Sequence, residues 1–167
     1  DGIGDACDSP PAILYVDDDA PPGGDGRSWA TAFNNLQNAL YLATYPRVQE
    51  VWVAAGTYKP DRGTGDRSNS FELPRSTPVF GGFVGNETDR GQRDPAQNET
   101  ILTGDLNGDD GPSFANREDN SLRVVTAIEG SDTVWFMIDG FTITAGNADA
   151  ASGALDEYRR GAGLQAE

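Results

Sequence analysis

Residues 132–147 form the stretch that most limits what this chain can fold into. They contain two runs of β-forming residues, Thr133–Ile138 and Phe141–Thr144, which are joined by Asp139-Gly140 and followed by Gly146-Asn147. An Asp-Gly pair between two short strands can form a tight hairpin. It can also form a corner, at which the chain turns to another sheet face and continues in the same direction. We favour the corner, because similar strand-and-turn units recur through the chain.

Other short segments rich in β-branched and aromatic residues predict further strands. These segments are Ala12–Val16, Glu50–Ala54, Phe71–Leu73, Thr77–Phe80, Thr100–Thr103 and Leu122–Ile128. Long polar stretches separate several of them, and few dipeptides are typical of hairpins. The pattern therefore predicts many short strands joined by corners and loops.

One helix is predicted over residues 28–44. Large apolar residues recur there at steps of three and four, as on one face of a helix: Trp29, Phe33, Leu36, Leu40 and Ala43. Ser28 or Thr31 can cap its start, and it should end before Tyr45-Pro46. A single amphipathic helix among strands needs a surface on which to bury its face, and covering one end of a strand stack provides it.

The composition excludes several classes of function. The 167 residues include 27 acidic and 12 basic side chains, for a net charge of −15, and a nucleic-acid interface needs a basic surface instead. Histidine is absent, which excludes Ser-His-Asp and Cys-His catalysis and any histidine-ligated metal. No apolar run approaches membrane-spanning length, so we expect no membrane insertion.

The first eight residues read Asp-Gly-Ile-Gly-Asp-Ala-Cys-Asp, in which glycines separate Asp1, Asp5 and Asp8. Such a loop can fold its carboxylates around a hard cation such as calcium, although a frayed acidic terminus has the same composition. The string resembles the end of a thrombospondin type 3 repeat, an extracellular calcium-binding unit. This resemblance implies that Cys7 pairs with a cysteine of a neighbouring repeat. We therefore expect residues 1–11 to be a tail and linker, cut from a longer precursor, and residues 12–167 to form the main domain.

The strongest chemical motif is Asp105-Leu-Asn107-Gly-Asp109-Asp110. Oxygen ligands at alternate positions around a glycine resemble the first half of an EF-hand-type or dockerin-type calcium loop. The twelfth position holds Asn116 rather than Glu, so Glu118, Asp119 or Asn120 would have to complete the site. A plain polar turn is the alternative. The triplet Asp17-Asp18-Asp19 can also hold calcium, but such runs are more often solvated loops.

Ordered motifs over residues 12–150 resemble bacterial right-handed parallel β-helix proteins of the pectate-lyase-like superfamily. The resemblance rests on Tyr15-Val-Asp, Gly24-Asp-Gly, Ser28-Trp-Ala-Thr-Ala-Phe, Val51-Trp-Val-Ala-Ala-Gly-Thr-Tyr, Val79-Phe-Gly-Gly-Phe, Gln92-Arg-Asp-Pro, Thr100-Ile-Leu-Thr-Gly-Asp and Asp139-Gly-Phe-Thr-Ile-Thr-Ala-Gly-Asn. It implies an all-β fold, in which residues 12–167 are the N-terminal part of a short right-handed parallel β-helix. The 28–44 helix would cap its N-terminal end.

The resemblance also implies a secreted or surface-bound protein, but no catalytic residue of the superfamily can be carried over. We therefore expect a non-enzymatic extracellular structural or adhesive module, stabilised by calcium. Because the chain stops where another strand should begin, its partners would be other copies, stacked into a filament or surface layer, or the remaining turns of a longer chain. The alternative is a carbohydrate-active module, either a polysaccharide lyase, a hydrolase or a polysaccharide-binding domain, which rests on fold analogy alone. Trp52 and Trp135 favour core or interface positions over sugar platforms.

Overall fold

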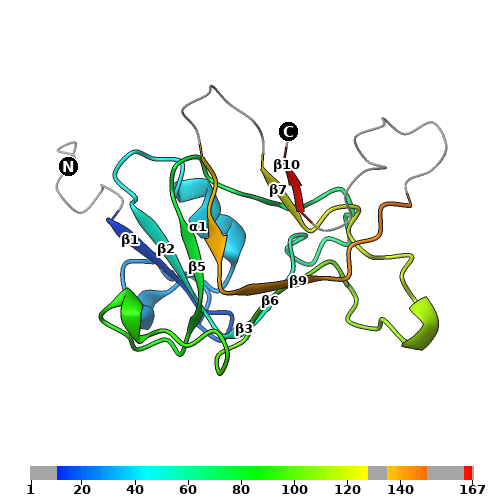
Figure 1. Cartoon of the computed structure of the whole chain (residues 1–167), viewed down its shortest axis with the longest axis horizontal. Coiled ribbons are helices and arrows are strands. Elements are labelled where there is room, and N and C mark those ends of the chain that lie inside the picture. The colour runs from blue at the N-terminus through cyan, green and yellow to red at the C-terminus, as the bar shows by residue number, and fades with distance from the viewer. Residues whose placement is uncertain (1–10, 128–134, 150–163, 167) are drawn as a thin grey trace.

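Short parallel strands in three sheets make up most of the regular structure of the computed structural model, which describes residues 11–127, 135–149 and 164–166 (Figure 1). The first sheet has the order β1-β2-β5-β8 and contains β1 (Ile13–Val16), β2 (Glu50–Ala54), β5 (Val79–Phe83) and β8 (Ile138–Asp139). The second has the order β3-β6-β9 and contains β3 (Gly56–Tyr58), β6 (Thr100–Thr103) and β9 (Phe141–Thr144). The third has the order β10-β7-β4 and contains β4 (Phe71–Glu72), β7 (Val125–Ala127) and β10 (Leu164–Ala166). All pairings between these strands are parallel.

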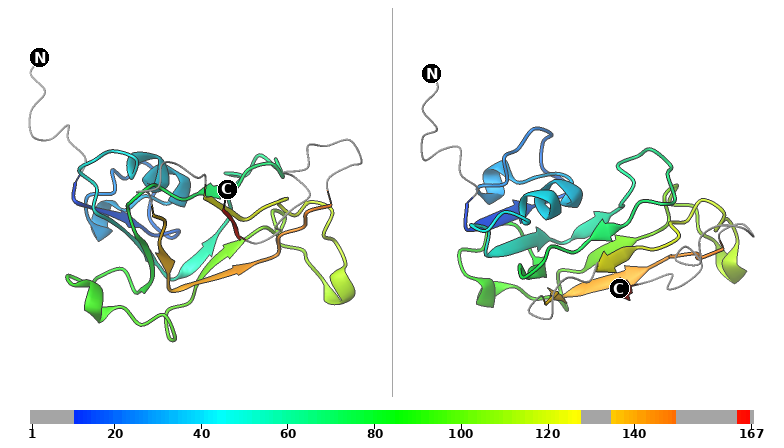
Figure 2. Two further views of the ribbon diagram at one scale, coloured as in Figure 1. Left: turned by 45° about the horizontal axis from the view of Figure 1, so that its top comes forward. Right: turned by 90° about the horizontal axis from the view of Figure 1, so that it is seen from above.

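The chain passes from sheet to sheet rather than back and forth within one sheet. After β1 it forms the helix α1 (Leu36–Leu42), and from β2 onward it visits the first, second and third sheets in turn. Seen from above, α1 lies beside β1, away from β9 (Figure 2). Some of these connections are single-residue corners, at Ala55 between β2 and β3 and at Gly140 between β8 and β9, whereas longer loops link β3 to β4 and β6 to β7.

The prediction of a single all-β solenoid, a right-handed parallel β-helix, is wrong. The strands lie in three separate sheets, and the helix packs against β1, β2 and β4, in an α/β-like arrangement. Leu36, Ala39 and Leu40 of the helix belong to the same core as the strands, so the helix is part of the packed interior and not only a cap on its end. Strand-and-turn spacing in a sequence indicates how often strands occur, but it does not determine how they divide among sheets.

The predicted helix over residues 28–44 is also corrected. Trp29–Thr31 form a 3₁₀ turn, η1, and the α-helix begins only at Leu36. Between them Phe33 is extended beside β1, donating its N–H to Tyr15 O at 2.9 Å and accepting from Asp17 N at 2.9 Å. The N-cap is neither Ser28 nor Thr31 but Asn35, whose side chain accepts from Gln37 N at 2.9 Å. Asparagine is among the best N-cap residues, and pairing with β1 prevents Phe33 from joining the helix.

The first sheet is apolar on both faces, since alternate residues of a strand point to opposite sides. The face that joins the main core carries Leu14, Val16, Val51, Val53 and Val79. The opposite face carries Trp52, Phe80 and Phe83, with Tyr15 and Trp29 packed against them. Trp52 stacks on Phe83 with ring centroids 4.7 Å apart and is buried, so of the two predicted positions, core or interface, it occupies the core.

Residues 84–95 cover this outer aromatic cluster. The Arg90 guanidinium lies 4.6 Å from the centroid of the Phe80 ring, and the Arg93 guanidinium lies 5.0 Å from it. Trp29 Nε1 donates to Glu87 O at 3.0 Å. The aromatic face is therefore closed by the protein's own loop.

Asp139-Gly140 is a corner and not a hairpin. β8 pairs with β5 of the first sheet, whereas β9 pairs with β6 of the second, so the two strands around the corner do not pair with each other. Gly140 has φ 83°, and a Cβ there would lie 2.7 Å from Gly81 O. The left-handed backbone and the close approach both require glycine at this position.

The segment before this corner exposes apolar surface, as its alternation of large residues indicated. Trp135 is 47% exposed and Met137 is 42% exposed, while Phe136 between them packs partly against the main core. Trp135 is therefore not a core residue, unlike Trp52. Its side chain lies on the surface beside β8, the last strand of the first sheet.

Candidate metal centre

The loop between β6 and β7 is organised around Asp105, the second residue after β6. Asp105 Oδ1 accepts hydrogen bonds from Gly108 N at 2.6 Å and from Asp109 N at 3.1 Å. Its Oδ2 accepts from Asp110 N at 3.2 Å. An aspartate side chain that binds the backbone a few residues ahead closes a tight turn. Asp105 therefore folds the 105–110 motif around its own carboxylate.

Asp119 joins this turn from the far end of the loop. Its Oδ2 accepts from Asn107 N at 2.8 Å. As a result, carboxylate oxygens of Asp105, Asp109 and Asp119 all lie within 4.8 Å of one another. Of the residues proposed to complete the motif, Asp119 is the one whose carboxylate joins this group.

Like charge accumulates at the exposed carboxylate of Asp109. Desolvation, followed by the negative charges of Asp119, Asp105 and Asp110, raises the pKa of Asp109 above its ordinary value. A cation among the three oxygens would reverse this repulsion. The donor set consists of carboxylate oxygens, which are the ligands that calcium prefers.

The remaining residues of the predicted set have other roles in the structure. Asn107 contributes its backbone N–H to Asp119, and its own side chain is exposed. Asp110 Oδ2 accepts from Asn120 Nδ2 at 2.9 Å and lies outside the group of three carboxylates. The five predicted ligands in this loop thus divide into three clustered carboxylates and two neighbours that help to hold the turn.

Asn120 lies at the base of the loop and is fully buried. Its amide nitrogen binds Asp110, but its Oδ1 has no hydrogen-bond partner. An unpaired buried acceptor costs free energy, so a partner for this oxygen would stabilise the loop. An amide oxygen is also a ligand that calcium accepts.

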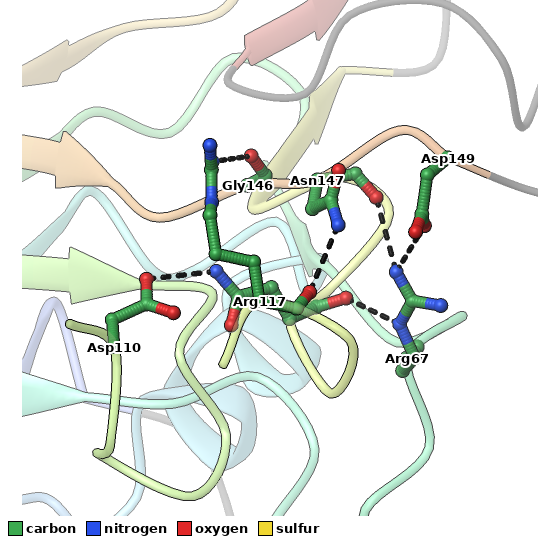
Figure 3. A network of polar contacts seen from close by, with 7 residues as sticks. Arg67, Asp110, Arg117, Gly146, Asn147 and Asp149 are labelled. Carbon is green, nitrogen blue, oxygen red and sulfur yellow. Dashed lines mark hydrogen bonds and ion pairs between the residues drawn. The ribbon is translucent and has the colours of Figure 1, made fainter. Parts of the chain in front are cut away.

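Arg67 anchors this base to two distant segments (Figure 3). Its Nε donates to Asn120 O at 2.6 Å, and its Nη2 donates to Asn147 O at 3.3 Å. The same Nη2 forms an ion pair with Asp149. The acidic loop is therefore tied to the turn before β4 and to the segment after β9.

A second set of contacts holds the loop to residues 146–147 (Figure 3). Arg117 Nη2 donates to Gly146 O at 2.9 Å, and Asn147 Nδ2 donates to Arg117 O at 2.8 Å. The positively charged side chains of this network thus bind carbonyl oxygens on one side of the loop. The carboxylates of Asp105, Asp109 and Asp119 gather on another part of the same loop.

The triplet Asp17-Asp18-Asp19 forms a second group of carboxylates whose oxygens lie within 4.8 Å of one another. Asp18 Oδ2 accepts from Thr57 N at 2.9 Å, so this side chain connects the end of β1 to β3. Desolvation outweighs that hydrogen bond and raises the pKa of Asp18, with further contributions from Asp19 and Asp17. Desolvation and then the charge of Asp18 raise the pKa of the buried Tyr58 hydroxyl. The structure thus gives Asp18 a direct structural role.

Asp1, Asp5 and Asp8, the other predicted calcium ligands, lie outside the described residues, as does Cys7. Comparison with known proteins finds no matching family model, no matching curated protein and no matching solved structure. Among the described residues, no helix is both long enough and apolar enough to cross a membrane.

Two buried carboxylates were missed by the sequence analysis. Glu87 accepts from the backbone N–H groups of Val84, Gly85 and Asn86 at 2.6, 3.0 and 3.0 Å. Asp61 is 3% exposed and lines a pocket beside α1. A polar loop around each residue hides such burial in the sequence, because only the folded chain shows what covers them.

Proposed function

We propose that this chain is a non-enzymatic extracellular structural module whose long loop between β6 and β7 is stabilised by calcium. The observation that carries the proposal is the convergence of the Asp105, Asp109 and Asp119 carboxylates, whose oxygens lie within 4.8 Å of one another. Their mutual repulsion makes the loop unfavourable without a counter-ion, and calcium is abundant outside cells. The acidic composition, with a net charge of −15, fits the same setting.

The bound cation would be held by oxygen atoms that this chain already places together. Asp105 would supply a carboxylate fixed by three backbone donors, and Asp109 and Asp119 would supply two more. Calcium accepts about six to eight oxygen ligands in flexible geometry, so backbone carbonyls and water would supply the rest. Magnesium demands a smaller, more regular shell and should bind this exposed loop more weakly.

The test is thermal unfolding with calcium, with magnesium and with a chelator. Calcium should raise the midpoint of the wild-type protein, because a ligand that binds only the native state stabilises it. The double variant Asp109→Asn with Asp119→Asn should lose this rise, since it removes two charged ligands and keeps the side-chain shapes. Asp94→Asn is the control for the loss of one acidic charge elsewhere, because Asp94 lies outside this loop and its carboxylate accepts from Ala96 N at 3.1 Å. An equal rise in the double variant, or no rise in the wild type, would contradict the proposal.

An assembly role is part of the same proposal. β8 and β9 are the last strands of the first and second sheets, and Trp135 and Met137 are exposed beside β8. Contacts between copies at this side would cover both side chains and stabilise a surface layer or filament. Light scattering with negative-stain microscopy tests this role, and a protein that stays monomeric at millimolar calcium would contradict it.

A carbohydrate-active module remains the rival function. Binding to a panel of acidic and neutral polysaccharides separates it from the structural proposal. Saturable binding or cleavage by this chain would contradict a purely structural role.

A further inference from the structure

A pocket of about 700 Å³ lies between α1 and the chain that leads from β3 to β4. It is separate in the fold from the acidic loop between β6 and β7, and none of the three clustered carboxylates lines it. Ligand-binding pockets commonly have about this volume. The side chains around it combine three kinds of chemistry: hydrogen-bond acceptors, apolar surface and arginines.

Asp61 provides an acceptor that the protein leaves unused. Its Oδ2 accepts from Gly65 N at 2.8 Å, and its backbone carbonyl accepts from Thr64 Oγ1 at 2.8 Å. Its Oδ1 is buried and has no hydrogen-bond partner. The turn over residues 61–65 therefore fixes the carboxylate and satisfies only one of its two oxygens. A buried carboxylate oxygen without a donor is costly, so a donor supplied by a ligand would stabilise the site.

Gln37 adds a second acceptor from the helix. Its Nε2 donates to Pro60 O at 2.9 Å and to Ser70 O at 2.9 Å, which uses both of its N–H groups. Only Oε1 of this side chain is left for a further hydrogen bond. Gln37 on the helix and Asp61 on the loop can therefore each accept a hydrogen bond from a donor group of a ligand.

The other side chains define the rest of the ligand. Leu40 and Leu73 supply apolar walls, and Tyr41, which is 67% exposed, borders the pocket from the helix. The side chains of Arg62 and Arg75 also line it and place positive charge beside these walls. A ligand that matches all three features carries a donor cation, an apolar body and an anionic group.

We propose that this pocket binds a small zwitterion with an apolar side chain, that is, a free amino acid or a short peptide. The ammonium group would donate to Asp61 Oδ1 and Gln37 Oε1. The carboxylate would be held by Arg62, which suits it because guanidinium groups bind carboxylates with paired donors. The aliphatic side chain would pack against Leu40 and Leu73. This inference is independent of calcium binding at the other loop.

The experiment uses the whole chain and four defined probes: leucine, leucyl-leucine, N-acetyl-leucine and leucinamide. Calorimetry measures binding, and the amide NMR signal of Gly65, which bonds Asp61, reports the site directly. We expect saturable binding of leucine or leucyl-leucine with a Kd of about 1 mM or tighter. Tighter binding of leucine would indicate a free amino acid as the ligand, and tighter binding of leucyl-leucine would indicate a short peptide. Blocking the ammonium group in N-acetyl-leucine should abolish binding, and blocking the carboxylate in leucinamide should weaken it about tenfold.

Two variants test the assignment of the charged groups. Asp61→Asn should weaken the preferred probe at least about tenfold, and Arg62→Gln should weaken it by a similar factor but leave leucinamide unchanged. Asp94→Asn and Arg47→Gln are the matched controls, since neither residue lines the pocket. Circular dichroism checks that each variant is folded, and Tyr41→Ala, an exposed position, provides a pocket variant that spares the buried turn.

Several results would overturn the inference. One is the absence of both heat and a Gly65 shift with every probe at about 10 mM. Another is equal binding of the blocked and free forms. Binding of a neutral disaccharide in place of the amino acids, unaffected by Asp61→Asn, would assign the pocket to another class of ligand.

Discussion

Glu87 and Asp105 are held by the backbone in the same way but lie in opposite surroundings. The Glu87 carboxylate accepts from three successive N–H groups, at 2.6, 3.0 and 3.0 Å. The Asp105 carboxylate also accepts from three successive N–H groups, at 2.6, 3.1 and 3.2 Å. Both residues therefore close a polar turn that follows a buried strand. The two turns differ in the charged side chains that lie around them.

The turn at Glu87 is complete within the chain. Glu87 is buried, its own backbone carbonyl binds Trp29, and Arg90 and Arg93 of the same segment lie over Phe80. Burial acts to raise the pKa of Glu87, but the three donors together lower it below its ordinary value. The turn at Asp105 is exposed, and it gathers Asp109 and Asp119 instead of arginines. The turn at Glu87 is thus stabilised by the chain alone, whereas the turn at Asp105 gathers negative charge that a cation can neutralise.

The largest loss of stability is expected from removing the Glu87 carboxylate. Glu87→Ala leaves three backbone donors without their acceptor in a buried turn, at about 1–3 kcal/mol for each unsatisfied group that water cannot reach. Because water can enter part of the turn, we expect a total loss of about 3 kcal/mol in the free energy of unfolding. Urea denaturation measures it, with Asp94→Asn as the control for the lost charge. A loss below about 0.5 kcal/mol would contradict this role, because it would show that water satisfies the three donors once the carboxylate is gone.

The next effect concerns the anchor of the acidic loop. Arg67→Met removes the contacts to Asn120 O, Asn147 O and Asp149, and should cost about 2 kcal/mol because hydrogen bonds of charged groups are the stronger ones. It should also weaken calcium binding, since the base of the loop would no longer be fixed. Calorimetry measures the calcium affinity, and urea denaturation in chelator measures the stability without calcium. Arg47→Met, at an exposed position, is the control. An unchanged calcium affinity in Arg67→Met would show that Arg67 stabilises the fold without shaping the calcium site.

Local residue patterns predicted part of this comparison correctly. The strands Glu50–Ala54, Thr100–Thr103 and Phe141–Thr144 have the bounds that their β-forming residues indicated. The 105–110 turn also followed from its own spacing, because an aspartate binds backbone N–H groups a few residues ahead. Each of these features depends on contacts close in sequence or on the alternation of a single strand.

Features that depend on distant contacts were not predicted. The helix was placed too early because Phe33 fits a helical spacing, yet its backbone pairs with β1. The division of strands among three sheets depends on which strand lies beside which, and no local pattern carries that information. Asp61 and Glu87 looked like ordinary loop residues, because their burial results from packing against α1 and the outer aromatic cluster. Among the three candidates to complete the acidic site, only the fold selects Asp119.

Acid should affect the two turns with opposite signs. The pKa of Glu87 in the folded protein lies below its ordinary value of 4.5, so its stabilising contribution is full above that pH and is lost as the pH falls through the folded value. The pKa of Asp109 is raised above 3.8, so its contribution is full below pH 3.8 and is lost as the pH rises through the folded value. Relative to wild type, Glu87→Gln should therefore lose less stability on acidification, and Asp109→Asn should lose more. Urea midpoints from pH 3 to pH 6, in chelator, measure both slopes, and slopes that change in the same direction in both variants would contradict the assignment.

The smallest effect should come from monovalent salt. Salt screens repulsion between exposed charges, so sodium chloride in the presence of chelator should raise the unfolding midpoint of the wild type slightly. Asp109→Asn should respond less, because one member of the exposed cluster has lost its charge. Glu87→Gln should respond like the wild type, since the Glu87 carboxylate is buried and its partners are backbone groups. Salt acts on any exposed charge, whereas calcium should act through the positions of the oxygens, so a variant that loses the calcium response but keeps the full salt response would mark a specific site. If both responses fell in proportion, the cluster would attract cations only as a diffuse negative surface.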